Sequence, residues 1–384
     1  MAVSDGSGLR RVALLIPQLM PLGGTEVQIS LLARELRARN IDVKVLVLRR
    51  GGRHTESPRL KGMLEGIEVH QLGFVPVSGR PSALARNLRA CISLLRLLRR
   101  LRPQVLHAFL YFGYVVGAPV ARLARVPVVV AGRRSQGFFK RSRRWVLALE
   151  RGATRLTDHV VANAVAIAGE TRAVERVPAR KLSVIYNGLP EPAFDPVEPE
   201  HVDTSLPVIV CIANLLEVKG HRFLMEAAAL LSRQGRACTV VLIGEGPERG
   251  PLEAQAAALG VDVRFLGCRT DTAGFLARAD VVALPSLSEG LSNAVMEAMA
   301  AGRPIVATSV GGTPELLEDR GVLVPAADSP ALAEGFVRLL DDPELAASLG
   351  AAARAWARKN LDVAVMADQH VTLYQRLLEA RCAG

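Results

Sequence analysis

The chain of 384 residues is poor in features that mark several classes of protein. Its five cysteines include no Cys-x-x-Cys pair, which argues against a disulfide framework or a zinc site. No window of eighteen apolar residues occurs, and the first apolar run, Val12–Ile16, is too short for a signal-peptide core or a membrane span. We therefore expect a protein that is made and kept in the cytosol.

Acidic residues are scarce in the first half of the chain. Residues 1–190 hold 32 Lys and Arg against 11 Asp and Glu, a net charge of +21, whereas residues 191–384 hold 16 against 26, a net charge of −10. Such a contrast indicates an anionic partner for the first half, either a membrane surface, a nucleic acid or a phosphorylated substrate. The other explanation is that a GC-rich coding background has given the chain an Arg-rich, Ala-rich composition. No zinc-finger, RNA-binding or helix-turn-helix pattern supports nucleic acid.

Short apolar runs alternate with segments of helical period along the whole chain, which predicts an α/β fold of parallel sheets covered by helices. The strands predicted in the first half are Val12–Ile16, Val43–Leu48, Glu68–Gln71, Val105–His107, Val128–Ala131, His159–Val161 and Ser183–Ile185. Those predicted in the second half are Val208–Cys211, Thr239–Ile243, Val263–Phe265, Val281–Leu284, Ile305–Ala307 and Val322–Val324.

Four prolines in the ten residues 190–199 predict a semi-rigid linker between two doubly wound, Rossmann-like domains. The expected organisation is a basic N-terminal domain over residues 1–190, a linker over 191–204, a C-terminal domain over 205–360, and a helix over 361–384 that packs back on the first domain. Such a pair of domains would leave a ligand cleft facing the carboxyl ends of both sheets.

The segment Ser286–Ala300 joins a strand end to a helix start. A helix beginning near Ser292 or Asn293 would leave the backbone N–H groups of residues 290–293 without intrahelical partners, which makes an anion site suited to phosphate. Glu289 then lies beside this site, and Glu297 follows eight residues later. Two carboxylates flanking a phosphate site suit the hydroxyls of a nucleotide sugar. The plainer alternative is one Glu near a helix start and another on its solvent face.

This arrangement closely resembles the E-x7-E motif of the retaining glycosyltransferases of family 4, which have two Rossmann-like domains in the architecture called GT-B. The resemblance covers nearly the whole chain, and the other segments that carry it are Pro17–Glu26, Val161–Ala166, Val184–Gly188, Val240–Arg249, Phe265–Gly267 and Val310–Glu315.

The resemblance implies roles for residues on the donor side. Glu297 would hold the nucleotide ribose and Glu289 would contact the transferred sugar. The backbone near the donor phosphates and sugar would come from residues that follow Glu289 or that lie in other glycine-containing loops, namely Gly290, Leu291, Ser292, Asn293, Gly23, Gly24 and Gly267.

Lys219 lies just after the first strand of the second half, where a cation would stabilise a departing diphosphate. The family usually pairs this Lys with an Arg five residues earlier, and that position is Asn214 here. Asn donates a hydrogen bond but carries no charge. The expected two-cation clamp is therefore weakened, or another residue such as Arg222 completes it.

A second departure from the family follows the strand Val128–Ala131, where many relatives carry a His that approaches the transferred sugar. This chain has Arg133 and Arg134, either of which could hold an acidic group of donor or acceptor. Neither can act as a general base near neutral pH, because guanidinium stays protonated. His107, at the end of its own strand, is the histidine candidate in the cleft, with a core position as its alternative.

The resemblance implies transfer of a sugar, with retention, from a nucleotide diphosphate donor to a hydroxyl, with a UDP-sugar favoured over a GDP-sugar. No Asp-x-Asp pair is present to hold Mg²⁺ or Mn²⁺ on the diphosphate, so we expect no metal and no cofactor beyond the co-substrate. The segment Gly244–Gly250 imitates a dinucleotide fingerprint, but its last spacing is one residue too long.

Aromatic and basic residues gather in Gly137–Trp145, and Leu84–Leu101 combines leucines at helical spacing with five arginines. This composition favours contact with an anionic membrane surface. The expected acceptor is a lipid-linked saccharide or cell-envelope glycan intermediate at the inner face of the cytoplasmic membrane. Two alternatives stay open: a nucleotide-sugar epimerase or hydrolase of GT-B fold, and a catalytically degenerate scaffold that binds a nucleotide sugar. The sequence does not fix the oligomeric state.

Overall fold

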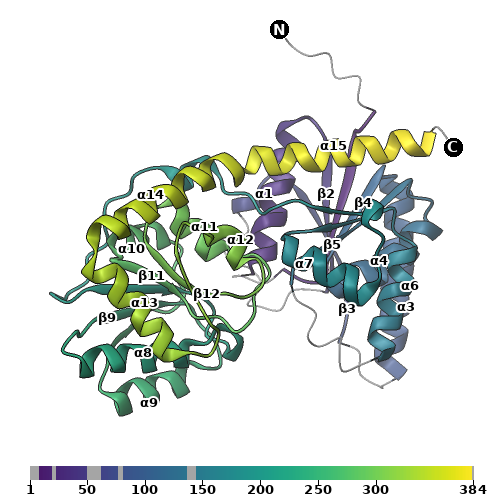
Figure 1. Cartoon of the computed structure of the whole chain (residues 1–384). Helices are drawn as coiled ribbons and strands as arrows, with labels where there is room; N and C mark the ends of the chain where they lie inside the picture. Colours follow the sequence, from purple (N-terminus) through teal and green to yellow (C-terminus); the bar gives the residue numbers. More distant parts are fainter. Residues whose placement is uncertain (1–7, 20–22, 50–61, 77–80, 136–143, 383–384) are drawn as a thin grey trace, which may run out of the picture. The chain divides into compact units, whose positions relative to one another are not determined.

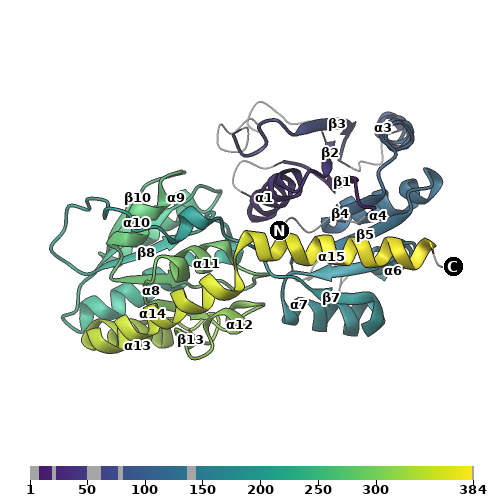
Figure 2. The same cartoon turned by 90° about the horizontal axis from the view of Figure 1, so that it is seen from above.

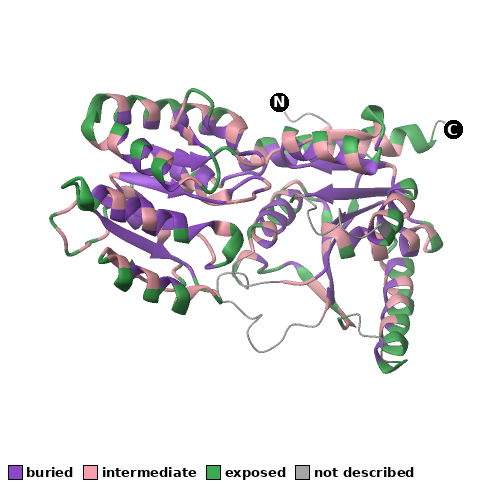
Figure 3. Ribbon diagram, turned by 60° about the horizontal axis from the view of Figure 1, so that its bottom comes forward, coloured by how far each residue is buried: buried purple, intermediate pink, exposed green. Residues whose placement is uncertain are grey.

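The computed structural model describes residues 8–19, 23–49, 62–76, 81–135 and 144–382. The chain divides into two compact units, of which unit 1 is Met1–Gly188 with Val363–Gly384 and unit 2 is Leu189–Asp362 (Figure 1). Each unit contains a parallel sheet whose inner strands are buried, as Figure 3 shows in purple. This confirms the predicted α/β class.

Unit 1 contains a seven-stranded sheet in the order β3-β2-β1-β4-β5-β6-β7. Its strands are β1 Arg11–Ile16, β2 Asp42–Arg49, β3 Glu68–Phe74, β4 Val105–Phe109, β5 Val128–Arg133, β6 His159–Ala162 and β7 Leu182–Val184. Its helices are α1 Gly24–Ala38, α3 Pro81–Leu101, α4 Leu110–Leu123, α6 Arg144–Arg155, α7 Val165–Glu170 and α15 Val363–Cys382.

Unit 1 has one hydrophobic core on each face of its sheet, and side chains of β1 point alternately into the two cores. Val12, Leu14 and Ile16 pack with residues of α1 and α15, while Ala13 and Leu15 pack with residues of α3, α4 and α6. Successive residues of a strand point to opposite faces, so a run that is apolar throughout indicates a sheet covered on both sides. Figure 2 shows α15 alongside α1 and across β5, which it also contacts.

Unit 2 contains a six-stranded sheet in the order β10-β9-β8-β11-β12-β13. Its strands are β8 Val208–Ile212, β9 Thr239–Ile243, β10 Asp262–Phe265, β11 Val281–Leu284, β12 Ile305–Thr308 and β13 Val322–Val324. Its helices are α8 His221–Arg233, α9 Arg249–Leu259, α10 Thr272–Arg278, α11 Asn293–Ala300, α12 Thr313–Leu317, α13 Ser329–Asp341 and α14 Pro343–Asn360. All the strands expected from the sequence are present in the two sheets, with ends shifted by a few residues.

The proline-rich segment expected to be a linker is instead packed within unit 2. Residues Glu191–Phe194 form a 3-10 turn, and the Phe194 side chain is only 2% exposed. Arg354 of α14 donates a hydrogen bond to the Phe194 carbonyl (2.6 Å), and the Arg358 guanidinium lies over the Phe194 ring. The prolines therefore shape a packed strap, and the division between units falls at Gly188 and Leu189.

Helix α15 covers a buried aromatic cluster in unit 1. His107 of β4 is fully buried, and its Nδ1 lies 2.7 Å from the hydroxyl of Tyr374 in α15. His370, one turn earlier in α15, donates from Nδ1 to the Met366 carbonyl at 2.8 Å. Burial, and then the charge of Arg134, lowers the pKa of His370 to about 4.

None of the helices in the described part of the chain combines the length and the apolar character needed to cross a membrane.

We predict that Phe194→Ala lowers the free energy of unfolding of unit 2 by about 3–5 kcal/mol, because it empties a buried aromatic site. Urea unfolding followed by Trp356 fluorescence in a Trp145→Phe background measures this change. Val197→Ala, in the same segment but 44% exposed, is the matched control and should change stability by no more than about 0.5 kcal/mol. Equal effects of the two substitutions would contradict the packed strap.

A second prediction concerns acid stability. The unfolded chain takes up a proton on His370 below its ordinary pKa of about 6.5, whereas the folded chain does so only near pH 4. The free energy of unfolding therefore falls as the pH drops through that window, by up to about 1.4 kcal/mol per pH unit for this one group. Urea unfolding at a series of pH values should give a shallower acid slope for His370→Gln than for the wild type. Parallel slopes would show that His370 is not the group responsible.

Candidate donor and acceptor sites

The candidate donor residues of unit 2 meet in a direct ion pair. Lys219 Nζ lies 2.6 Å from Glu289 Oε1, although the two residues are seventy positions apart. The Glu289 side chain is buried, whereas the Lys219 side chain is 22% exposed. Ser286, also buried, donates from its hydroxyl to the same carboxylate oxygen at 2.7 Å. Among the described residues, Lys219 thus has Glu289 as its ion-pair partner and keeps part of its side chain exposed.

Two glycines bring the three loops of this site together. Gly220 has φ of +67°, and a Cβ there would lie 2.1 Å from the Pro285 carbonyl oxygen. Gly311 has φ of +55°, and a Cβ there would lie 2.1 Å from the Glu289 carbonyl oxygen. Only glycine accommodates both the positive φ and the close approach. The loop of Lys219 and the loop of Gly311 therefore press directly on the segment that carries Glu289.

Helix α11 begins at Asn293, which confirms the helix start expected from the sequence. Ser292 is its N-cap and accepts a hydrogen bond on Oγ from the Val295 N–H at 3.4 Å. The Gly290 carbonyl accepts from the Gly312 N–H at 2.7 Å, which fixes the turn before the helix. Glu297 lies one turn into α11 and is half-buried. The N-terminal end of α11 and Glu289 are thus parts of one continuous segment at the end of β11.

Asn214 and Gly267 lie in the loops after β8 and β10. Both are half-buried, and the Gly267 carbonyl accepts from the Gly244 N–H at 2.8 Å. Arg222, the residue considered as a replacement for the missing cation, stacks its guanidinium 4.5 Å from the centre of the Phe223 ring.

Sequence reasoning gave no role to Ser286 or to His221, although both lie at this site. Ser286 is wholly buried and orients the Glu289 carboxylate. His221 follows the Lys219-Gly220 turn, is 2% exposed, and has no hydrogen-bond partner on either ring nitrogen among the described residues. Burial, and then the charge of Lys219, lowers the pKa of His221 to about 4, so the ring is neutral at pH 7.

In unit 1, the described part of the glycine loop leads into α1. Gly23 is the N-cap of α1, Gly24 is its first residue, and residues 20–22 lie outside the described residues. Glu26 lies in the first turn and is buried, with its carboxylate against Gly23. A cavity of about 300 Å³ opens beside it, and the side chains that line it include those of Glu26, Arg49, Phe112 and Arg134.

Arg134 is one of the arginines that line this cavity, and it follows β5 directly. It donates a hydrogen bond to the amide oxygen of Asn187, and its guanidinium lies 5.8 Å from the centre of the Phe109 ring. Burial lowers the pKa of Arg134 to about 10, and the nearby carboxylate of Glu26 partly offsets this. The side chain therefore stays cationic at neutral pH.

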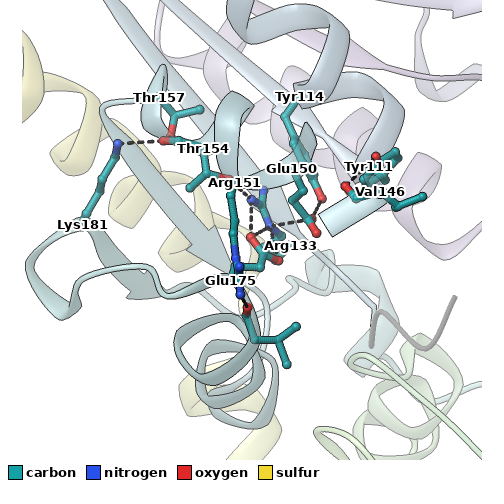
Figure 4. A network of polar contacts seen from close by, with 11 residues as sticks. Tyr111, Tyr114, Arg133, Val146, Glu150, Arg151, Thr154, Thr157, Glu175 and Lys181 are labelled. Atoms are coloured by element: carbon teal, nitrogen blue, oxygen red, sulfur yellow. Dashed lines mark hydrogen bonds and ion pairs between the residues drawn. The ribbon is translucent and has the colours of Figure 1, made fainter. Parts of the chain in front are cut away.

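Arg133, considered from the sequence as a ligand-binding residue, is held in an internal network (Figure 4). Its guanidinium donates to both carboxylate oxygens of Glu175 at 2.7–3.1 Å and to Thr154 Oγ1 at 2.8 Å. It also stacks on the Tyr114 ring, with 3.7 Å between the guanidinium carbon and the ring centre. The residue is only 3% exposed. Arg133 also lines the cavity, but most of its guanidinium is engaged in this network, so its part in binding acceptor or sugar stays a prediction.

His107 occupies the core position that was its alternative. It is fully buried beneath α15, stacks on Phe109, and pairs with the Tyr374 hydroxyl. Burial, followed by the charges of His370 and Arg134, holds the pKa of His107 well below its usual range. A neutral ring with no exposed surface does not reach a ligand, so the acceptor side is left to Arg133 and Arg134.

Of the aromatic and basic segment 137–145, only Trp145 has a described side chain, and it is 62% exposed. In the described part of the chain, no group of three or more His, Cys, Asp or Glu side chains is placed to hold a metal ion.

Both units match profiles of glycosyltransferases. The profile of Glycosyltransferase Family 4 matches residues 22–191, and that of Glycosyl transferases group 1 matches residues 206–342. The chain is 29% identical to 2-deoxystreptamine glucosyltransferase of Streptomyces kanamyceticus over 69% of this chain and 71% of that protein. It is 35% identical to a GDP-mannose-dependent alpha-(1-6)-phosphatidylinositol monomannoside mannosyltransferase of Mycolicibacterium smegmatis over 40% of this chain and 44% of that protein.

The chain spans only 44–60% of the length of six curated relatives, the mannosyltransferase of Mycolicibacterium smegmatis among them. Among solved structures, HepE of Anabaena in complex with UDP superposes with a TM-score of 0.80 at 24% identity, over 94% of this chain and 99% of HepE. That likeness establishes the GT-B fold. The two matched profiles and the two parallel sheets together show that the chain belongs to glycosyltransferase family 4.

Proposed function

We propose that the protein is a retaining glycosyltransferase that moves a sugar from a UDP-sugar to a hydroxyl of a lipid-linked saccharide or cell-envelope glycan intermediate. The observation that carries the proposal is the ion pair between Lys219 and Glu289 beside the start of α11. It joins a cation for the leaving diphosphate to a carboxylate for the transferred sugar, at a helix N-terminus that favours negative charge.

The ion pair suggests how the donor is received. The diphosphate takes the exposed face of Lys219, and its negative charge competes with that of Glu289 for the ammonium group. Glu289, still held by Ser286, then accepts hydrogen bonds from the hydroxyls of the sugar. Glu297 receives the ribose hydroxyls, while Asn214 and Gly267 line the nucleotide side.

During transfer, negative charge builds on the diphosphate as the bond to the anomeric carbon breaks. Lys219 and the N–H groups at the start of α11 oppose that charge, which is an interaction stronger in the transition state than in the bound donor. The histidine among the described residues of the site is His221, which is buried and has a pKa lowered to about 4. It is therefore not placed to take the acceptor proton. The acceptor proton therefore goes to the departing phosphate oxygen, and the sugar is delivered on the face the diphosphate leaves.

The cavity of unit 1 is assigned to the sugar and acceptor side. Glu26 can accept hydrogen bonds from hydroxyls, and Arg134 can hold an anionic oxygen. Phe112, 45% exposed at the cavity, offers an apolar face on which a sugar ring can lie. Gly23 and Gly24 lie at the same helix start as Glu26, where the backbone can approach phosphate.

The relatives support a choice of donor base without fixing it. HepE is described in complex with UDP and, in a second structure, with UDP-glucose. The mycobacterial relative is by name GDP-mannose-dependent and acts on a phosphatidylinositol mannoside. HepE favours UDP as the donor base, and the mycobacterial relative favours a lipid-linked acceptor. The relative named for 2-deoxystreptamine favours a small soluble acceptor instead, which is the alternative to be tested.

A membrane-facing surface for the lipid-linked acceptor is available on unit 1. On α3, Leu84, Leu88 and Ile92 are 73%, 61% and 39% exposed and recur every fourth residue, so they form one stripe. Trp145 and Leu149 of α6 are also exposed, and α3 and α6 both pack against α4. Exposed arginines of α3 lie among these apolar side chains. This α3–α6 surface has the composition of an interfacial contact with anionic lipid.

The first test is a thermal-shift panel of UDP-, GDP- and ADP-sugars without metal. A ligand present at 100 times its dissociation constant adds about 2.7 kcal/mol to the folded state. We predict that a UDP-sugar raises the melting temperature of the wild type and of the control Glu334→Ala, an exposed position on α13, but not of Glu297→Ala. No shift with any sugar nucleotide, or an equal shift in all three proteins, would remove the donor site from these residues.

The membrane proposal is tested by sedimentation with anionic phospholipid vesicles. Each buried leucine side chain contributes about 1.5–3 kcal/mol to such partitioning. We therefore predict that Leu84→Ser with Leu88→Ser lowers the vesicle partition coefficient at least tenfold, whereas Val365→Ser, 39% exposed on α15, leaves it unchanged. Equal partitioning of all three proteins would reject the α3–α6 surface, and with it the argument for a lipid-linked acceptor.

A further inference from the structure

A second concave region of unit 1 is lined by cations and is separate from the sites described above. A hollow of about 320 Å³ is bordered by Arg151, Arg155, Arg176, Arg180 and Lys181. An adjoining hollow of about 500 Å³ shares Arg176, Val177 and Pro178 with the first and adds Arg172. We call these two hollows the basic groove.

The acidic side chains near the basic groove are already engaged. Glu175 borders the first hollow, but both of its oxygens accept hydrogen bonds from Arg133 (Figure 4). Asp158 is paired with Arg122 and with Arg381, each at 2.7 Å. The guanidinium groups of the groove therefore keep much of their charge for something outside the protein.

Two cations of the groove, Arg151 and Lys181, are held in place by hydrogen bonds to backbone carbonyls. Arg151 donates from Nη2 to the Val174 carbonyl at 2.7 Å, and its Nε–H is buried with no hydrogen-bond partner in the described part of the chain. Lys181 donates from Nζ to the Thr154 carbonyl at 2.8 Å, as Figure 4 shows. Both heads are thus oriented in advance, while Arg172, Arg176 and Arg180 are exposed and free to turn toward a ligand.

The topology sets the basic groove apart from the candidate acceptor cavity. Arg155 precedes β6, and Arg176, Arg180 and Lys181 precede β7, so these residues lie toward the amino ends of the parallel strands. Glu26 and Arg134 follow β1 and β5 and lie toward the carboxyl ends. A ligand in the groove is therefore not the sugar donor or the hydroxyl that receives the sugar.

We propose that the basic groove is a binding site for a phosphate group. Several guanidinium and ammonium donors that converge on a concavity without a free carboxylate match a tetrahedral dianion, whose oxygens accept several charge-assisted hydrogen bonds at once. The remaining lining is Gly169, Ala173, Thr154, Val177, Pro178 and Ala179, with no aromatic side chain on which a nucleic-acid base could stack. The phosphate belongs either to a soluble phosphate or to a phospholipid headgroup.

The pKa of Lys181 reflects its burial and the cations gathered around it. Burial, together with the positive charges of Arg122 and Arg180, lowers the pKa of Lys181, although Asp158 partly offsets this. Like charges gathered in a hollow destabilise one another, and a bound dianion relieves that repulsion. Binding of phosphate should therefore raise the melting temperature of the whole protein.

The test compares the full chain with two double variants. Arg176→Gln with Arg180→Gln removes two exposed cations of the groove. Arg10→Gln with Arg34→Gln removes two exposed cations of unit 1 that line neither hollow, and serves as the control. Circular dichroism and melting without phosphate establish that each variant folds. Affinity for inorganic phosphate is then measured by calorimetry in chloride buffer of matched ionic strength.

We expect phosphate to bind the wild type and the control alike and to bind the groove variant at least tenfold more weakly. Vesicles of phosphatidylcholine with and without phosphatidic acid distinguish the two sources, because all three proteins keep the α3–α6 surface intact. A loss of phosphatidic acid binding in the groove variant alone assigns the site to a headgroup, and equal vesicle binding assigns it to a soluble phosphate. If neither phosphate nor phosphatidic acid distinguishes the groove variant from the control, the proposal is wrong. The outcome does not depend on the donor test, which uses unit 2.

Discussion

The ion pair between Lys219 and Glu289 is the interaction on which the donor side depends. It fastens the loop after β8 to the loop after β11, and the glycines at 220 and 311 allow the backbones to come close enough for it to form. A buried carboxylate needs a partner, because an unpaired charge in the interior is costly. Lys219 supplies that partner while part of its surface stays open. In the proposed mechanism, the contact that holds the two loops together is also the one that a diphosphate would loosen.

The arginines of residues 1–190 lie in several different surroundings and have different roles. Arg133 neutralises Glu175 inside the fold, Arg134 stands at the candidate acceptor cavity, and the exposed arginines of α3 flank an apolar stripe. The basic groove gathers a further set toward the opposite end of the strands. The net charge of +21 over residues 1–190 could not distinguish these sets of arginines, because a total charge does not say which side chains are buried or where they point. Neighbouring residues 133 and 134 show how far two identical side chains can differ.

The alternation of apolar runs and helical segments was enough to predict both sheets, because parallel strands covered on both faces must be apolar throughout. The start of α11 was also readable, since Ser292 is a favourable N-cap at the end of a strand. Packing between residues that are far apart in the sequence could not be predicted. Four prolines indicated a semi-rigid linker between the domains, but Phe194 is buried against α14. His107 ends a strand, as a ligand-binding residue often does, yet α15 from the far end of the chain covers it.

The most direct test of the donor site is a calorimetric titration of UDP into the wild type, Lys219→Met and Glu289→Gln, all without metal. UDP has no transferred sugar, so Glu289 affects its binding through charge, by competing for Lys219 and by repelling the diphosphate. The proposed exchange predicts opposite signs: the dissociation constant rises at least tenfold in Lys219→Met and falls in Glu289→Gln, where the ammonium group is released from its partner. Weaker or unchanged binding of UDP by Glu289→Gln, or unchanged binding by Lys219→Met, would contradict it.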